Sequence, residues 1–291
     1  MKKKIRYIIN PKSGTKRKVD IKTLLNELTD AHTVDIDICL TKEPKHATEL
    51  AKEAAEKKYD IVVAVGGDGS ANETAKGLTG SGTALGIVPT GSGNGMARHL
   101  KIPMDTVDAI HVINRANSMK IDTVTVNGEF CLGTIGIGFD AHIAHLFAES
   151  KVRGYATYVK LVLSEFYKYE PKVFALSVDG NEYSRACFLL TFANSSQFGN
   201  NAVIAPFADV QDGILEVSMM SKFPAYAAPH LIYRLMNNII HKSRYFEMDK
   251  GKIVTVKNSN SLQGHIDGEP VTFQGNLEIR VVPASLSVIV P

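Results

Sequence analysis

Over the first 120 residues, short apolar runs alternate with amphipathic stretches. The apolar runs predict buried strands at 5–9, 34–39 and 60–65, and the stretches between them predict helices near 19–30, 45–57 and from about 71. Regular alternation of strand and helix is typical of a parallel sheet with helices packed on it. We therefore predict an α/β domain for this part of the chain.

From about residue 121 the pattern changes to short strands separated by glycine, asparagine and aspartate turns. Strands are predicted at 173–178, 187–192, 215–219 and 277–282, and helices near 140–169 and 224–242. The dipeptides Asn127-Gly128 and Asp179-Gly180 favour tight hairpins. We expect two domains, 1–120 joined by the last strand 284–291, and 121–283, with a small-molecule site in the cleft between them.

Composition narrows the class of protein. With 291 residues, 44% of them hydrophobic, the chain can bury a large core, and its net charge of +3 gives no reason to expect a nucleic-acid partner. Three scattered cysteines argue against a disulfide framework or a zinc site and favour a cytoplasmic location. The apolar run at 5–9 is too short for a secretion signal, and no run is long enough to predict a membrane-spanning helix.

Candidate chemistry begins directly after the predicted strand at 60–65. Gly66-Gly67-Asp68-Gly69-Ser70 runs into a predicted helix, and such a turn offers backbone N–H groups and the positive helix end to phosphate. Asp68 suits a phosphate site if it holds Mg²⁺ or accepts a proton, although a tight turn with an aspartate cap is an alternative. A second glycine-rich loop, Pro89 to Gly95, is expected beside the first at the carboxyl edge of the sheet.

Four segments resemble, in the right order, the signatures of the diacylglycerol kinase catalytic family: Asn10–Gly14, Gly66–Ser70, Pro89–Asn94 and Ile266–Pro270. That family includes soluble bacterial diacylglycerol kinases and sphingosine kinases, and is distantly related to NAD kinases and phosphofructokinases. The resemblance spans almost the whole chain. It implies an α/β domain of the NAD kinase and phosphofructokinase type, a C-terminal β-sandwich, and an ATP-dependent kinase that phosphorylates a lipid hydroxyl, most simply that of diacylglycerol.

The same resemblance implies a set of ATP contacts: Asn10, Pro11, Lys12, Ser13, Gly14, Thr41, Gly66, Gly67, Asp68, Gly69, Ser70, Ala71, Asn72 and Thr90. Ser70 stands where the family usually has threonine, and the hydroxyl is kept. In soluble bacterial members, two aspartates and a backbone carbonyl hold a Mg²⁺ away from the nucleotide. They correspond here to Asp209, Asp212 and the carbonyl of Ile214. From the residues alone, a turn at Asp212-Gly213 is the preferred interpretation.

The resemblance also implies the catalytic carboxylates. Asp267 is expected to take the proton of the acceptor hydroxyl, as the matching aspartate does in the bacterial enzymes. Asp68 is the rival, because the aspartate of the glycine-rich loop has that role in sphingosine-kinase-like members. A plain hairpin turn at Asp267-Gly268 is the structural alternative. Glu269 completes the catalytic set, and the presence of all three carboxylates argues against a binding protein without turnover.

Three other features have weaker interpretations. Gly136–Ala141 fits a loose dinucleotide fingerprint but lacks the βαβ context, so a nicotinamide cofactor is not expected. His142 and His145 could share a helix face, but without a third ligand they are interpreted as surface or cleft residues. Cationic and aromatic residues gather at 151–168, which fits either a membrane interface or an ordinary amphipathic surface.

The expected partners are therefore ATP, Mg²⁺ and a lipid that the protein reaches transiently at the inner face of the membrane, as a peripheral protein. A homodimer is left open. A sphingoid base or another lipid, or a soluble acceptor such as NAD, stays an alternative to diacylglycerol.

Overall fold

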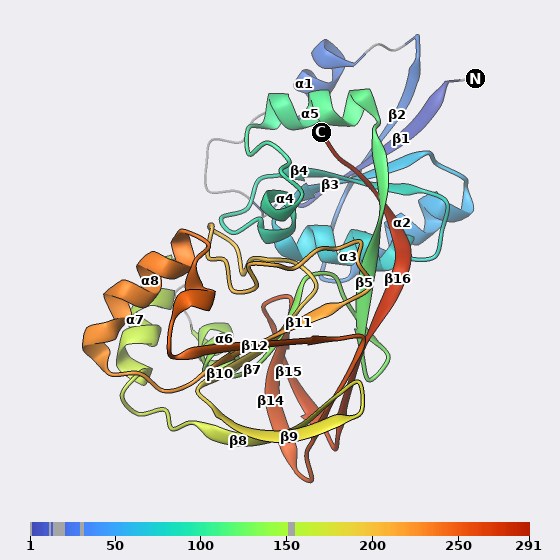
Figure 1. Ribbon diagram of the computed structural model, residues 1–291. Helices are drawn as coiled ribbons and strands as arrows, with labels where there is room; N and C mark the ends of the chain where they lie inside the picture. Colours follow the sequence, from blue (N-terminus) through green and yellow to red (C-terminus); the bar gives the residue numbers. More distant parts are fainter. Residues whose placement is uncertain (1, 12, 14–20, 30–31, 151–154) are drawn as a thin grey trace. The chain divides into compact units, whose positions relative to one another are not determined.

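The structure is a computed structural model that describes residues 2–11, 13, 21–29, 32–150 and 155–291 (Figure 1). The chain forms two compact units, residues 1–123 with 283–291, and residues 124–282. Strands β5 (Ser118–Val126) and β16 (Leu277–Ile289) each run from one unit into the other. The division of the chain is therefore made by two extended strands and not by a linker.

The first unit is built on a parallel sheet in the order β2-β1-β3-β4, followed by the end of β16, in which Val288 is paired in parallel with Leu85. Its strands are β1 (Lys3–Ile9), β2 (Val34–Leu40), β3 (Ile61–Gly66) and β4 (Ala84–Pro89). The residues of β3 and β4 are buried throughout, as expected for strands covered on both faces. The sheet confirms the α/β class predicted from the alternating pattern.

The helices of this unit are α1 (Ile21–Leu28), α2 (His46–Glu56), α3 (Asp68–Leu78), α4 (Gly95–His99) and α5 (Thr106–Arg115). Helix α3 begins at Asp68, three residues before the predicted start at about 71. The glycine-rich turn is therefore shorter than expected, since Asp68, Gly69 and Ser70 already belong to the helix. Its first residues, and not a long loop, follow the end of β3.

The second unit is a sandwich of two mainly antiparallel sheets. One contains β8 (Lys172–Val178), β9 (Asn181–Cys187), β13 (Ile253–Lys257), β6 (Glu129–Cys131) and parts of β5 and β16. The other has the order β12-β11-β10-β7-β14-β15, with bounds Phe246–Gly251, Leu215–Met220, Leu189–Ala193, Thr134–Gly138, Ser261–Ile266 and Glu269–Gln274. The predicted β-sandwich is confirmed.

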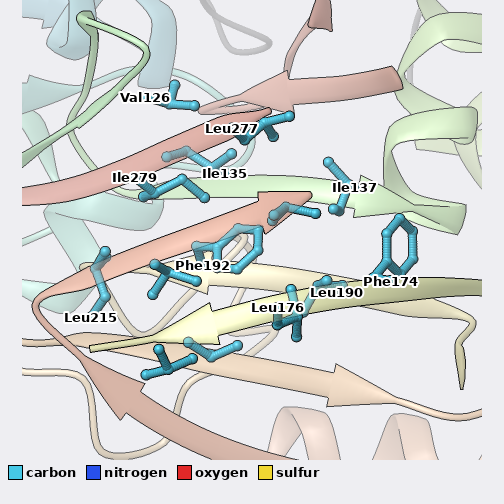
Figure 2. Packing of buried hydrophobic residues seen from close by; sticks show 14 of the residues in the cluster. Val126, Ile135, Ile137, Phe174, Leu176, Leu190, Phe192, Leu215, Leu277 and Ile279 are labelled. Atoms are coloured by element: carbon cyan, nitrogen blue, oxygen red, sulfur yellow. The ribbon is translucent and has the colours of Figure 1, made fainter. Parts of the chain in front are cut away.

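The core of this unit lies between its two sheets (Figure 2). Ile135, Ile137, Leu190 and Phe192 come from one sheet, and Leu277, Ile279 and Leu176 come from the other. All are at most 1% exposed, so their burial supplies a large apolar contribution to the stability of the sandwich. Strand alternation turns the other side chains of these strands outward, where helices or solvent meet them.

The helices of the second unit are α6 (Phe139–Glu149), α7 (Tyr155–Glu165) and α8 (Ala228–Met236), with the short 3₁₀ turns η1 (Ala225–Ala227) and η2 (Ile240–Lys242). The single helix predicted over 140–169 is two helices, with residues 151–154 outside the described part of the chain. None of the helices in the described ranges is long and apolar enough to cross a membrane.

Two predicted hairpins are confirmed. Asn127 and Gly128 join β5 to β6, and Asp179 and Gly180 join β8 to β9. All four have positive φ, between 48° and 90°, as the tight turn requires. Asp267 (φ 50°) and Gly268 (φ 85°) form a turn of the same kind between β14 and β15.

Candidate active site

The nucleotide contacts expected from the sequence gather at one edge of the parallel sheet. Asn10, Thr41, Gly67 and Thr90 each follow directly on the carboxyl end of a strand. Backbone hydrogen bonds connect these ends: the Asn10 N–H donates to Val65, that of Thr41 to Ile9, and that of Thr90 to Gly66, at 2.8–3.1 Å. Four segments far apart in the sequence therefore meet at the carboxyl edge, the usual ligand-binding edge of such sheets.

Three glycines shape this edge in two different ways. A Cβ on Gly91 would lie 2.5 Å from the Gly67 Cα, and a Cβ on Gly66 would lie 2.2 Å from the Ser70 Oγ, so close packing requires glycine at both positions. A Cβ on Gly69 would meet nothing within 4 Å. The protein's own packing does not explain the missing side chain at Gly69, whereas a ligand approaching the backbone would.

The start of α3 has the properties of a phosphate site. Gly67 is its N-cap and provides no side-chain bond to the first turn. The positive end of the helix dipole therefore faces this edge without a cap from Gly67, and it favours an anion. The Ser13 Oγ lies 3.1 Å from the Thr90 Oγ1 and donates to the Asn10 carbonyl, which places two hydroxyls beside the glycine loops. These residues fit a nucleotide phosphate.

The remaining expected nucleotide contacts differ in how far they are exposed. Ala71 is buried at 4% exposure in α3, Asn72 is half-buried, and Pro11 is exposed. Lys12 and Gly14 lie outside the described residues. The backbone at 71 belongs to the first turn of the helix, because the Ala71 N–H donates to the Gly67 carbonyl.

Asp68 reaches from α3 to the second glycine loop. One carboxylate oxygen accepts from the Asn94 N–H and the other from the Gly95 N–H, both at 2.7 Å. Asn94 is the N-cap of α4, has positive φ (54°), and gives no side-chain cap bond of its own. Asp68 therefore caps α4. The sequence left open a capping role for this aspartate at its own helix, whereas the structure shows it capping the next one.

Asp267 is held in a similar way in the second unit. Its carboxylate accepts from three successive backbone N–H groups, those of Leu132, Gly133 and Thr134, at 2.7–2.9 Å. The Asp267 N–H in turn donates to the Thr134 carbonyl at 2.8 Å. The turn before β15 and the segment before β7 are thereby joined. Glu269, the first residue of β15, is exposed.

A buried histidine–aspartate pair adjoins the Asp267 turn and was not predicted. The His265 Nε2 lies 3.1 Å from the Asp140 Oδ2, and its Nδ1 accepts from the Gly268 N–H at 3.3 Å. Because Nδ1 is an acceptor, the ring proton of the neutral form lies on Nε2 and is donated to Asp140. A Cβ on Gly136 would lie 2.1 Å from the Asp140 oxygen. Gly136 therefore makes room for this pair.

The carboxylates proposed for a separate metal site lie in one exposed turn. The Asp209 Oδ1 accepts from the Gln211 N–H and the Asp212 Oδ1 from the Ile214 N–H, both at 2.9 Å, as in Asx turns. Glu216, only 6% exposed, follows on β11, and burial together with the nearby Asp212 raises its pKa to about 7.

This accumulation of carboxylates suits the chemistry of a hard divalent cation. Among the described residues, no group of three or more His, Cys, Asp or Glu side chains is arranged to hold a metal ion. The proposed site has only two such side chains, Asp209 and Asp212, and one carbonyl. Water molecules would have to supply the remaining ligands. Glu216 was missed because a glutamate in a strand gives no sign of its burial.

The two histidines of helix α6 contact protein groups. The His142 Nε2 lies 3.0 Å from Glu165 of α7, and the His145 Nε2 lies 3.2 Å and 3.1 Å from the carbonyls of Gly264 and Val271. Both histidines join α6 to neighbouring elements.

Comparison with known proteins identifies the family. Residues 4–126 match the diacylglycerol kinase catalytic domain, and residues 133–290 match the YegS C-terminal NAD kinase β-sandwich-like domain. A protein of Chromohalobacter salexigens named "Probable lipid kinase YegS-like" is 27% identical over 87% of this chain and 83% of its own length. A Staphylococcus aureus protein named "Diacylglycerol kinase" is 25% identical over 92% of this chain and 87% of its own.

A solved structure of a Bacillus anthracis protein, described as a diacylglycerol kinase, has the same fold. The TM-score is 0.75 at 21% identity, over 99% of this chain and 97% of that one. The glycine loops at the carboxyl edge, the β-sandwich and the two matched domains lead to one conclusion: this chain belongs to the diacylglycerol kinase catalytic family of lipid kinases and carries the YegS-type C-terminal domain.

Proposed function

We propose that this protein transfers the γ-phosphoryl group of ATP to the hydroxyl of diacylglycerol and so forms phosphatidic acid. The observation that carries the proposal is the carboxyl edge of the parallel sheet, where two tightly packed glycine loops adjoin a helix start that lacks a side-chain cap from its N-cap residue. Such an edge fits the phosphates of a nucleotide, and family membership supplies the lipid as the class of acceptor.

In this proposal the first unit binds ATP. The backbone from Gly66 to Asn72 surrounds the phosphates, and Asn10 to Gly14, Thr41 and Thr90 complete the contacts. The open space at Gly69 is where the nucleotide approaches the backbone most closely. Asp68 keeps the second loop in place through its bonds to Asn94 and Gly95.

The second unit supplies acceptor chemistry. The hydroxyl of diacylglycerol loses its proton as the bond to phosphorus forms, and Asp267 is the proposed acceptor of that proton, with Asp68 as the rival and Glu269 in support. The three N–H groups that bind Asp267 fix its position and leave it little rotational freedom. A positioned base of this kind is effective because its orientation is already determined.

Mg²⁺ is proposed at two places. With ATP bound, it neutralises charge on the transferring phosphoryl group, the usual requirement of this chemistry. A second ion is proposed at Asp209, Asp212 and the Ile214 carbonyl, close to Glu216, whose pKa is raised to about 7 mainly by burial and further by the charge of Asp212. As a kinase of a membrane lipid, the protein is proposed to act as a peripheral protein at the inner face of the membrane.

The test compares a glycine at the proposed nucleotide site with a glycine elsewhere that has equally open space around it. At both Gly69 and Gly82 a Cβ would meet nothing within 4 Å, and neither has positive φ. Gly69→Val should abolish ATP binding in calorimetry and abolish labelling of diacylglycerol from γ-labelled ATP. Gly82→Val should leave both near the wild-type values. Equal ATP affinity in the two variants would contradict the proposed nucleotide site.

The acceptor is tested side by side with the wild-type protein. Diacylglycerol, sphingosine and NAD are offered with ATP and Mg²⁺, and only diacylglycerol should become labelled. Labelling of sphingosine alone would assign the protein to sphingoid-base kinases, and labelling of NAD alone would overturn the lipid-kinase proposal.

A further inference from the structure

Helix α8 and the 3₁₀ turn before it are apolar on two faces. Leu231, 5% exposed, packs inward with Ile240 and Phe246. On the opposite side Tyr226 is 79% exposed, and Ile232 and Tyr233 are 59% exposed. A surface helix normally presents polar residues to solvent. The outer face of α8 is unusual because it presents apolar and aromatic residues instead.

The outer residues form a continuous stripe. Tyr226, Pro229, Tyr233 and Met236 are all exposed and recur at spacings of three and four, which places them along one side of the helix. With Ile232 they are called the α8 surface below. Two exposed residues of the α7 region, Leu163 and Tyr167, have the same character at 68% and 72% exposure.

The segments next to the two helices are in contact. The rings of Phe166 and Phe223 lie 5.0 Å apart, and Lys222 pairs with Glu170 at 2.6 Å. The segment that follows α7 therefore contacts the segment that precedes η1 and α8. Within the α8 surface, the exposed apolar residues lie on consecutive turns and are not scattered singly, which is the arrangement that marks an interaction site.

The segment that contains α8 has basic residues and no acidic ones. Between Ser221 and Tyr245 there are four Lys and Arg residues and no Asp or Glu, although the whole chain has 33 basic and 30 acidic residues. Lys222 is paired with Glu170, but Arg234 and Arg244 donate to neutral groups, the imidazole of His230 and the hydroxyl of Tyr245. Their positive charges are not neutralised by these partners.

Aromatic and aliphatic residues surrounded by unneutralised cations suit a partner with an apolar interior and an anionic surface. A bilayer with anionic headgroups has this composition. Tyrosine favours its interface, and lysine and arginine near the surface are attracted to the headgroups. A second copy of the chain suits it less, because a two-fold contact would bring two acid-free segments together.

We infer that the α8 surface docks the protein on an anionic bilayer. Tyr226, Ile232, Tyr233 and Met236 enter the interface while Arg234, Lys242 and Arg244 contact phosphate headgroups. The inference rests on the proposed function, since a kinase of a membrane lipid must reach its acceptor at the bilayer.

The experiment measures sedimentation of the full chain with vesicles of phosphatidylcholine, with and without phosphatidylglycerol. Ile232→Ser with Tyr233→Ser should weaken binding to the anionic vesicles at least about tenfold, as should Arg234→Gln with Arg244→Gln. Val173→Ser and Arg280→Gln, at exposed positions on other elements, are the matched controls and should bind like the wild type. Thermal unfolding confirms that each variant is folded.

Unchanged vesicle binding in both α8 variants would overturn the inference. A shift from dimer to monomer with unchanged vesicle binding would make the surface a contact between copies instead, which also overturns it. Activity on a short-chain, water-soluble diacylglycerol separates this inference from the proposed function. The α8 variants should keep that activity, whereas its absence in the wild type would count against the proposed function alone.

Discussion

At the residue scale, the two candidate bases are held in the same manner. Asp68 accepts two backbone N–H groups and Asp267 accepts three, each from a segment distant in the sequence. Bonds to an ionised carboxylate are about twice as strong as neutral ones. Both side chains are therefore positioning groups for loops as well as candidates for chemistry.

Asp267→Asn tests the base directly. Turnover should fall roughly 10²- to 10⁴-fold while the affinity for ATP changes little, because the amide cannot take the acceptor's proton. The amide also brings an NH₂ group against a backbone N–H, so the melting temperature should fall as well. Steady-state kinetics and calorimetry separate the two effects. Near-normal turnover would transfer the role to Asp68.

Asp140→Asn tests the buried pair. The carboxylate accepts from the His265 ring on one oxygen and from the Ala141 N–H on the other. In either orientation the asparagine amide places a donor against a donor, which should cost about 1–3 kcal/mol of stability. Nitrogen NMR of labelled histidine should show the proton of His265 on Nε2 in the wild type. A proton on Nδ1 would contradict the assigned tautomer.

Glu216 makes stability depend on pH. Its folded pKa, about 7, is above the ordinary value of 4.5, so the buried group resists ionisation. Folding is therefore unaffected by this group at low pH and loses stability as pH rises from about 4.5 to about 7. Glu216→Gln, which cannot ionise, should melt higher than the wild type at pH 8 in chelator, and the difference should vanish near pH 4. A constant difference across this range would contradict the assignment.

At the element scale, helices of the first unit depend on one another's side chains for their caps. Lys45, the N-cap of α2, has positive φ (70°) and provides no side-chain bond. Glu73 of α3 takes that role, since its carboxylate accepts the N–H groups of Lys45 and Ala47 at 2.9 and 3.2 Å. The segment after the first glycine loop therefore stabilises a neighbouring helix in addition to its proposed nucleotide contacts.

Glu73→Ala should accordingly lower stability by about 1–2 kcal/mol, the usual effect of losing a cap. Glu49→Ala is the matched control, because Glu49 is an exposed carboxylate in the first turn of α2, the helix that Glu73 caps. Urea unfolding measures both variants. An equal loss in the two would mean that helix charge, and not the cap bonds of Glu73, accounts for the effect.

At the scale of the whole molecule, the expected nucleotide contacts all belong to one unit, and Asp267, Glu269 and the proposed metal ligands belong to the other. This supports the proposed division of labour between an ATP-binding and a lipid-binding domain. The proposed ion at Asp209 and Asp212 lies wholly within residues 124–282, so its effect on stability is measurable without ATP.

Mg²⁺ alone should therefore raise the melting temperature, because an ion that binds only the folded state stabilises it. Asp212→Ala should abolish the rise. Sodium chloride at equal ionic strength is the control for screening of surface charge. The same rise in wild type and variant would place the ion elsewhere.

The sequence by itself determined several of the strands, two of the hairpins and the class of fold. Alternating apolar periods and the dipeptides Asn127-Gly128 and Asp179-Gly180 act over a few residues, so the chain carries them locally. The family signatures could also be recognised from the sequence, since each is a short continuous run of residues. Two of them contain a glycine at which a side chain would clash, Gly66 and Gly91.

Only the tertiary structure decided which groups those residues meet. Asp267 binds N–H groups more than 130 positions away, and His265 meets Asp140 across 125 positions. Whether Glu216 is buried, or Tyr226 and Tyr233 are exposed, depends on which face of an element the rest of the chain covers. Local pattern sets the period of a helix or strand, but packing between distant segments decides which side of it becomes core, site or surface.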